Sequence, residues 1–325
     1  MTPQANQAEP ILGVDIGGTK VAVGIVDRTG NILAQERKPM VANGTAEAAL
    51  QAVTSAIDSV LSTARGEIQS IGICSPGPLD PRTGIVLNPP NLPCWRNFPL
   101  AEKIAAKYLV PVKVDNDANA AALAETRWGA ARGYHYVFYT CIGTGIGTGI
   151  VFDGRIYHGH TGSAGEGGHV SIDYRGPVCG CGKRGCIEAL AAGPAIAARA
   201  RSKLGAASSH SAILDLAEGD IAAVTSEMVG QAYSAGDPLA TEILAETIRL
   251  LAIWLGNIVD LLDPDVIVMG GGVAAMLKPF FDQLKNRLPS WCVNPRAAEI
   301  PLLTAHYGAD AGIAGGAALC ADGLP

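Results

Sequence analysis

Short apolar runs alternate with longer segments of helical spacing along this chain, and a similar succession appears in both halves. In the first half the apolar runs predict strands over Ile11–Asp15, Val21–Val26, Ile32–Glu36, Ile68–Cys74 and Val110–Val114. Helical spacing and good helix formers predict helices over Ala46–Ala64, Leu100–Leu109 and Ala118–Trp128. Glycines between the first two strands indicate a tight turn there.

The second half repeats this scheme. Strands are predicted over Val137–Ile142, Ile150–Asp153 and Val266–Met269, and helices over Pro238–Leu262 and Tyr307–Cys320. Because each half opens with strand, glycine turn and strand, the pattern favours an α/β protein of two domains with a cleft. We expect a small domain at residues 1–118, with the last helix (about 308–325) packing back on it, and a large domain at 119–307 with a metal-binding insertion.

Composition narrows the classes of partner. The chain has 325 residues, 48% of them hydrophobic, which is enough to fill two cores. A net charge of −6 and the lack of a basic run argue against nucleic acid. The longest uncharged run of the most apolar helix, Leu250–Val259, is far shorter than the ~20 residues that a membrane span requires. Residues 1–10 show no export signal, so we expect a cytoplasmic protein that does not bind membranes.

The densest chemical pattern joins one histidine to three clustered cysteines: His169, Cys179, Cys181 and Cys186. Three thiols and one imidazole at this spacing can close a tetrahedral zinc site, and four protein ligands leave no open position, so the predicted zinc is structural. The alternative is a cluster of reduced thiols. His158 and His160 compete as ligands, but we expect both at the surface.

Two glutamates flank these ligands. Glu166 lies three residues before the histidine, and Glu188 lies two residues after the last cysteine. A metal ion would hold both carboxylates in place, and carboxylates fixed in this way suit the hydroxyls of a sugar.

Glycine turns after strands are the candidate phosphate-binding elements, because backbone amides can approach and donate to phosphate oxygens there. The first contains Asp15, Gly17, Gly18, Thr19 and Lys20, with Asp15 able to bind Mg²⁺ through water; the second contains Gly143, Thr144 and Gly145. Gly270 and Gly271 form a third turn that could lie under an adenine ring. Each could equally be an ordinary turn, but two such turns at corresponding points of two halves would hold a triphosphate from both sides.

Asn116 and Asp117 end a strand and open a helix. Asp117 could accept a proton from an attacking hydroxyl as a general base. Aspartate is also a favoured helix N-cap, and from this segment alone the cap is the stronger interpretation.

Together these motifs resemble the ROK family of bacterial sugar kinases and repressors, over about Ile11 to Cys320. The resemblance rests on Asp15–Lys20, on Asn116-Asp117-Ala118-Asn119, on Gly143–Gly149, and on Glu166-x-Gly-His169 with the cysteine-rich segment. It implies an actin-like ATPase (RNase H-like) fold, with two domains around a central cleft that closes over ATP and sugar. It also implies Asp117 as catalytic base and a sugar site of Gly77, Asn91, Asn116, Asp117, Glu166, His169 and Glu188. ATP, Mg²⁺, a structural Zn²⁺ and a homodimer, or a tetramer, belong to the same expectation.

The expected reaction is transfer of the ATP γ-phosphoryl group to the 6-hydroxyl of a hexose. Glucose is favoured, because Pro90-Asn91-Leu92-Pro93 and the cysteine-rich segment resemble those of bacterial glucokinases, although Cys94 stands where a glycine is common. Kinases of N-acetylmannosamine, N-acetylglucosamine, mannose or fructose are the alternatives within the family. A sugar-responsive repressor is disfavoured, because only 14 residues precede Asp15 and a helix-turn-helix module would not fit there. A non-catalytic sugar-binding protein would lack a base, and Asp117 is present.

Overall fold

The computed structural model describes residues 10–64, 67–206 and 210–321, which fall into two compact units. The first unit contains the chain up to His135, Gly149–Gly165 and the chain from His306 onward, and the second contains Tyr136–Thr148 and Glu166–Ala305. This division differs from the predicted boundary near residue 118, because the helix that starts there packs against the closing helix of the first unit. The chain passes between the units at 135/136, 148/149, 165/166 and 305/306.

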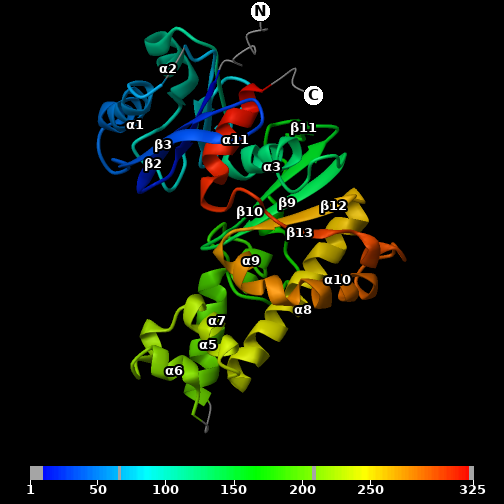
Figure 1. Cartoon of the computed structure of the whole chain (residues 1–325). Coiled ribbons are helices and arrows are strands. Elements are labelled where there is room, and N and C mark those ends of the chain that lie inside the picture. Colours follow the sequence, from blue (N-terminus) through cyan, green and yellow to red (C-terminus); the bar gives the residue numbers. More distant parts are fainter. Residues whose placement is uncertain (1–9, 65–66, 207–209, 322–325) are drawn as a thin grey trace, which may run out of the picture. The chain divides into compact units, whose positions relative to one another are not determined.

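The first unit is built on a five-stranded sheet of order β3-β2-β1-β4-β8 (Figure 1). Its strands are β1 (Ile11–Ile16), β2 (Lys20–Val26), β3 (Ile32–Pro39), β4 (Ile71–Ser75) and β8 (Val112–Asn116). β1, β2 and β3 are antiparallel neighbours, whereas β4 runs parallel to β1, and β8 parallel to β4. All five predicted strands are present, and β8 runs past the predicted end at Val114 to include Asp115 and Asn116.

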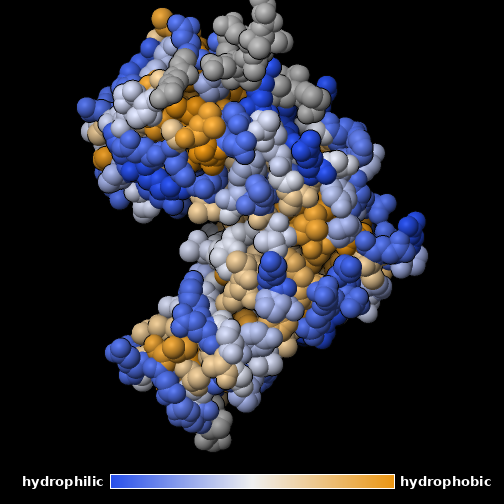
Figure 2. All heavy atoms as spheres, viewed as in Figure 1, coloured by the Kyte–Doolittle hydropathy of each residue, from blue (hydrophilic) through white to orange (hydrophobic). Residues whose placement is uncertain are grey.

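Burial along these strands follows their place in the sheet. All five residues of β4 are buried, whereas β3 alternates between exposed and half-buried positions, as expected for an edge strand with one face toward water. Figure 2 shows hydrophilic residues gathered over the β2–β3 region. Charged side chains on an edge strand of this kind discourage pairing with another chain.

The closing helix packs unusually close to the first sheet. α11 (Ala311–Cys320), preceded by the 3₁₀ turn η6 (Gly308–Asp310), lies against β1, β4 and α3 (Asp117–Arg127). A Cβ on Gly72 would lie only 1.7 Å from the carbonyl oxygen of Gly316, and a Cβ on Gly315 only 2.8 Å from the carbonyl carbon of Ala120. Because glycine and alanine stand at these contacts, α11 can lie directly against β4 and α3.

A second set of elements covers the apolar core of this unit. It consists of α1 (Ala46–Leu61), α2 (Leu100–Tyr108) and a small sheet of β5 (Leu79–Asp80), β6 (Ile85–Val86) and β7 (Phe98–Pro99). Trp95 is fully buried and stacks on Phe98 with ring centroids 4.8 Å apart, which anchors the segment after Asn91. The hydrophobic pattern did not predict this sheet, because two-residue strands are too short to show alternation.

The second sheet has the order β11-β10-β9-β12-β13 (Figure 1). Its strands are β9 (Tyr136–Ile142), β10 (Ile146–Phe152), β11 (Arg155–Ile156), β12 (Val266–Gly270) and β13 (Leu302–Thr304). β12 is parallel to β9 and to β13. The predicted repetition of the scheme is confirmed: in both sheets the first strand is followed by a glycine turn and its hairpin partner.

Helices make up most of the remaining second unit. The α-helices are α4 (Ile187–Ala191), α5 (Gly193–Ala206), α6 (Ala212–Leu216), α7 (Ser226–Ser234), α8 (Pro238–Leu262), α9 (Gly272–Leu277) and α10 (Phe281–Arg287). The 3₁₀ turns are η1 (Gly167–His169), η2 (Ile221–Ala223), η3 (Lys278–Phe280), η4 (Leu288–Ser290) and η5 (Ala297–Glu299). Among the described helices, none combines the length and the apolar composition that crossing a membrane demands.

Helix α8 connects the sheet of this unit to the loop that holds the cysteines. Asp237 caps its start by accepting from the Ala240 amide, and Pro238 occupies the first turn, where no amide donor is missed. Fully buried Trp254 packs edge-on against Phe138 of β9, and its indole Nε1 donates to the carbonyl of Gly167 at 3.0 Å. The loop that begins at Gly167 is thereby fixed to the core.

Candidate active site

The first glycine turn places Asp15 near the end of β1 and closes with a hydrogen bond from the Gly17 amide to the Lys20 carbonyl at 2.9 Å. Burial and the negative charge of Asp117 raise the pKa of Asp15 to about 6, although Lys20 and Arg37 oppose the shift. A Cβ on Gly312, at the start of α11, would lie 2.2 Å from Cγ of Asp15, so this helix leaves little room around the carboxyl group. At neutral pH this carboxylate is mostly ionised, and a bound cation would offset the cost of holding its charge in a buried position.

The sequence offered two roles for Asp117, helix cap and general base, and the structure gives the cap to Asn116. Asn116 is the N-cap of α3: its Oδ1 accepts from the amides of Ala118 at 2.9 Å and Asn119 at 3.4 Å. Asp117 is the first helical residue, and its side chain is exposed while Oδ1 also accepts from the Ala118 amide at 2.8 Å. The interpretation of Asp117 as the cap was therefore wrong, since the residue before it fills that position.

Gly77 lies beside Asn116, and Asn91 lies beside the first glycine turn. A Cβ on Gly77 would be 3.6 Å from the side-chain Nδ2 of Asn116, and a Cβ on Gly18 would be 2.8 Å from the backbone carbonyl oxygen of Asn91. The first unit thus brings together its share of the predicted residues from four separate segments of the chain.

The second glycine turn is held by Glu188. The Gly143 amide donates to the Gly145 carbonyl at 2.9 Å, and the Ile146 amide donates to Oε2 of Glu188 at 2.9 Å. A Cβ on Gly145 would lie 2.7 Å from the same Oε2. The other carboxylate oxygen, Oε1, is 3.8 Å from Nδ1 of His169 and 3.7 Å from Sγ of Cys179. Glu188 therefore contacts both the glycine turn and the cysteine cluster.

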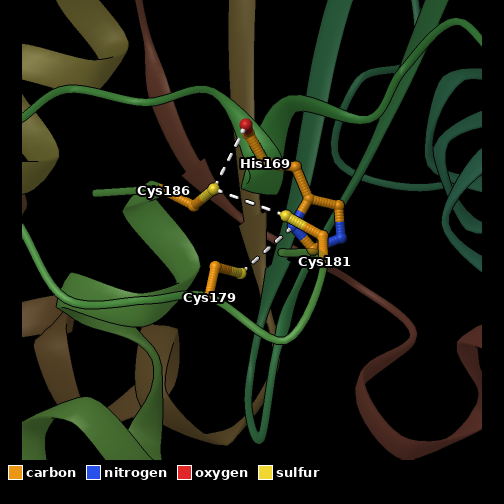
Figure 3. Close-up of side chains that lie close together, drawn as sticks. All are labelled: His169, Cys179, Cys181 and Cys186. Atoms are coloured by element: carbon orange, nitrogen blue, oxygen red, sulfur yellow. Dashed lines mark hydrogen bonds between the residues drawn. The ribbon is translucent and has the colours of Figure 1, made fainter. Parts of the chain in front are cut away.

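The predicted metal ligands converge. One donor atom from each of His169, Cys179, Cys181 and Cys186 lies within 4.8 Å of all the others. Figure 3 shows the three sulfurs and the imidazole ring gathered around one point. Gly167, next to Glu166, donates its amide to Oγ1 of Thr148 at 2.8 Å, which ties the histidine turn η1 to β10.

The spacing of these donors fits zinc and excludes disulfides. Zinc–sulfur bonds of about 2.3 Å and zinc–nitrogen bonds of about 2.0 Å in a tetrahedron separate two sulfurs by about 3.8 Å and a sulfur from a nitrogen by about 3.6 Å. Sγ of Cys181 is 3.7 Å from Sγ of Cys186, and Sγ of Cys179 is 3.6 Å from Nδ1 of His169. A disulfide would need about 2.05 Å between sulfurs. Burial and the neighbouring thiols raise the pKa of Cys186 to about 12 when no metal ion is bound.

The third glycine turn follows β12 and leads into α9. Gly271 has φ of +88°, and a Cβ there would lie 2.3 Å from the Ile142 carbonyl oxygen, so glycine is required where this turn meets the end of β9. A pocket of about 430 Å³ opens next to it, between α7 and α9, lined among others by Ser226, Gly230, Gly272 and Met276. The pocket has the size of a small-ligand site.

His158 is the residue that the sequence reasoning missed. It was expected at the surface, but it is half-buried, and its Nε2 lies 2.6 Å from Oδ2 of Asp115. That expectation was wrong because the partner carboxylate is 43 residues away in the chain. His160, two residues on, is exposed as expected.

Known proteins resemble this chain over nearly its whole length. The model of the ROK family matches residues 11–322. The glucokinase of Streptomyces coelicolor is 33% identical over 97% of this chain and 98% of that protein, and the N-acetylmannosamine kinase of Escherichia fergusonii is 34% identical over 96% and 98%. The crystal structure of a ROK family glucokinase from Streptomyces griseus, in complex with glucose and AMPPNP, matches with a TM-score of 0.79 at 33% identity, over 95% of this chain and 98% of that one.

The match to the family model covers both sheets, all three glycine turns and the cysteine cluster. The structure reproduces the fold that the motifs implied, with two α/β units of matching strand order. The chain therefore belongs to the ROK family and has the actin-like ATPase fold of that family.

Proposed function

We propose that this protein is a hexokinase-type phosphotransferase that moves the γ-phosphoryl group of ATP to the 6-hydroxyl of a hexose, with glucose as its substrate. Relatives named glucokinase, one of them solved with glucose and AMPPNP, support the reaction class. The observation that carries the proposal is the position of Asp117: an exposed carboxylate at the start of α3, close enough to Asp15 for its charge to raise the pKa of that buried acid.

Asp117 is the proposed general base. It accepts the proton of the 6-hydroxyl as the oxygen of that group attacks the γ-phosphorus, and ADP leaves from the opposite side. In phosphoryl transfer the protein contributes mainly position and charge stabilisation. Asn116, whose side chain caps α3, holds the first helical turn in the geometry that presents the carboxylate.

The two glycine turns are the proposed phosphate-binding elements. The amides of Gly18 and Gly145, with Thr144, Thr19 and Lys20, would donate to phosphate oxygens, while the amides of Gly17 and Gly143 close the two turns. When bound, Mg²⁺ neutralises phosphate charge, and Asp15 is the carboxylate assigned to it through water. The pocket between α7 and α9, beside Gly270 and Gly271, supports its assignment to the adenosine part of ATP.

The hexose hydroxyls are assigned to Gly77, Asn91, Asn116 and Asp117 in the first unit and to Glu166, His169 and Glu188 in the second. His169, Cys179, Cys181 and Cys186 would hold a structural zinc ion, which would support the latter group. With Nδ1 facing the sulfurs, Nε2 of His169 is left to donate to a sugar oxygen, as metal-bound histidines usually do with the second nitrogen.

One assay tests both the reaction and the sugar. ADP release with glucose, N-acetylglucosamine, N-acetylmannosamine, mannose and fructose, each at a range of concentrations, should give the highest kcat/KM for glucose. A higher value for N-acetylmannosamine would assign the chain to the activity of its second relative instead. ADP release with none of the five sugars would overturn the proposed function. The homodimer implied by the resemblance, the cytoplasmic location expected from residues 1–10 and a role in glycolysis remain predictions, and sedimentation of the purified protein tests the first.

A further inference from the structure

His158 and Asp115 form a partly buried contact that no proposed step of the reaction uses. Nε2 of His158 is 2.6 Å from Oδ2 of Asp115, whose side chain is only 5% exposed against 33% for the histidine. Hydrogen bonding to this carboxylate raises the pKa of His158, although burial opposes the shift. Such a short contact to a buried carboxylate is a charge-assisted hydrogen bond.

The Asp115 carboxylate organises the residues around it. Its Oδ1 accepts from the backbone amide of Asn116 at 2.7 Å and from Nδ2 of Asn119 at 3.1 Å. In the described part of the chain, Oδ1 of buried Asn119 has no hydrogen-bond partner, so the contact with Asp115 alone sets the orientation of this amide. Asp115 thus holds the residues on both sides of Asp117.

His158 belongs to a loop that closes on itself. The Ala164 amide donates to the His158 carbonyl at 3.0 Å, and the Tyr157 amide donates to the Ile150 carbonyl at 2.8 Å. Two residues after Ala164 the chain reaches Glu166, the first residue of the second unit. The imidazole therefore fastens the loop that leads into Glu166 to the strand end that carries Asn116 and Asp117.

We propose that His158 is a positioning residue of the phosphotransferase: through Asp115 it fixes the start of α3, and through the 158–164 loop it fixes the approach to Glu166. This role rests on the proposed function, since Asp117 and Glu166 are its targets. His158 is not among the residues assigned above to the hexose or to the phosphates. Misplacement of catalytic groups by about 1 Å can cost on the order of a hundredfold in rate, which sets the scale of the expected effect.

The test compares His158→Ala with His160→Ala, an exposed histidine of the same loop, and with His158→Gln. Glutamine places an N–H donor the same number of bonds from Cβ as Nε2 of histidine. We expect His158→Ala to lower kcat/KM for the hexose about ten- to a hundredfold, with the KM for ATP changed less than twofold. His158→Gln should recover most of the loss, and His160→Ala should match the wild type.

Two results would overturn the positioning role. One is a kcat/KM of His158→Ala within twofold of that of His160→Ala. The other is an equal loss in His158→Ala and His158→Gln accompanied by an equal fall in melting temperature, which is the mark of a merely structural residue.

Hydrogen exchange separates this proposal from the proposed function. Residues 115–119 and 157–165 should both exchange faster in His158→Ala than in His160→Ala, whatever the activity of the protein. Unchanged exchange in both segments would show that His158 does not hold the loop to the strand end at Asp115, even if the variants lose activity. A wild type that phosphorylates no hexose would refute the kinase, while the exchange data would still decide whether the contact holds the two segments.

Discussion

In both sheets the first strand has two neighbours: the strand that follows it after a glycine turn, and a parallel strand from later in the chain. β1 lies between β2 and β4, and β9 lies between β10 and β12. The residues at corresponding positions differ in chemistry. Asp15 is the last residue but one of β1, and the residue at that position of β9 is Cys141. The first turn contains Lys20 at its far end, whereas the second turn has no charge of its own and takes a carboxylate from Glu188 instead.

The comparison shows how one backbone plan serves two chemical tasks. In the first unit, the acid and the cation are encoded within the turn itself, next to the exposed Asp117. In the second unit, the turn depends on a distant helix start, α4, and on the cysteine cluster that precedes it. Under the proposed function, the first unit would supply the reactive carboxylates, and the second would supply a binding surface supported by the predicted zinc.

The largest expected effect concerns the first unit, which contains Asp117. Asp117→Asn keeps the size of the side chain but removes the base, so kcat should fall by about 10³, within the range that general bases contribute, while hexose binding stays within a few-fold. Asp282→Asn, which changes an exposed aspartate in the first turn of α10, is the matched control. Coupled ADP assays give kcat, and equilibrium titration gives hexose affinity. Near-normal turnover by Asp117→Asn would show that Asp117 is not the general base and that the first unit does not supply it.

The next effect tests whether substrate binding by the second unit depends on a metal ion. Cys181→Ser should release zinc and raise the KM for hexose about ten- to a hundredfold, because Glu188 loses the cluster beside its Oε1. The KM for ATP should rise as well, since Oε2 of Glu188 holds the second turn. Elemental analysis measures the metal, and Cys292→Ser controls for loss of a thiol in the same unit. Full loss of zinc with unchanged kinetics would contradict the dependence.

The two halves also differed in how much the sequence revealed. The strand–turn–strand units, the cysteine cluster and Asp117 were all found in the sequence, because their signals lie within about ten to twenty neighbouring residues. The contacts of Glu188 with Ile146 and of His158 with Asp115 join residues 42 and 43 positions apart, and no periodic pattern encodes such a pairing. The N-cap was assigned one residue too late, since Asn116 and Asp117 are both favoured caps and only the backbone decides between them.

A smaller effect tests the contact of Glu188 with the second turn. In Gly145→Ala the new methyl group would lie 2.7 Å from Oε2 of Glu188, so the turn or the carboxylate must shift. The KM for ATP should rise several-fold, up to about tenfold, with kcat changed less. Gly205→Ala adds a methyl group where nothing lies within 4 Å, and it should leave the kinetics unchanged. An unchanged KM in Gly145→Ala would show that Glu188 is not needed to hold this turn.

The smallest effect concerns stability and sharpens the contrast between Asp15 and its counterpart Cys141. Burial and the charge of Asp117 raise the pKa of Asp15 to about 6 from 3.8, so ionising this group at neutral pH costs the folded state on the order of 1–3 kcal/mol. Asp15→Asn should therefore raise the melting temperature by several degrees in Mg²⁺-free buffer at pH 7, while kinase activity is lost.

The pH dependence of this gain has a definite sign. Between about pH 4 and 6 the folded state holds a proton on Asp15 that the unfolded state has released, so the wild type loses stability as the pH rises through this window. The difference in melting temperature between Asp15→Asn and the wild type should grow from pH 4 to pH 6 and stay constant above it. Saturating Mg²⁺ and ATP should reverse the order of the two proteins, because ligands that bind only the folded wild type stabilise it. If the difference in melting temperature does not change from pH 4 to pH 7, the pKa of Asp15 is not raised in the folded protein.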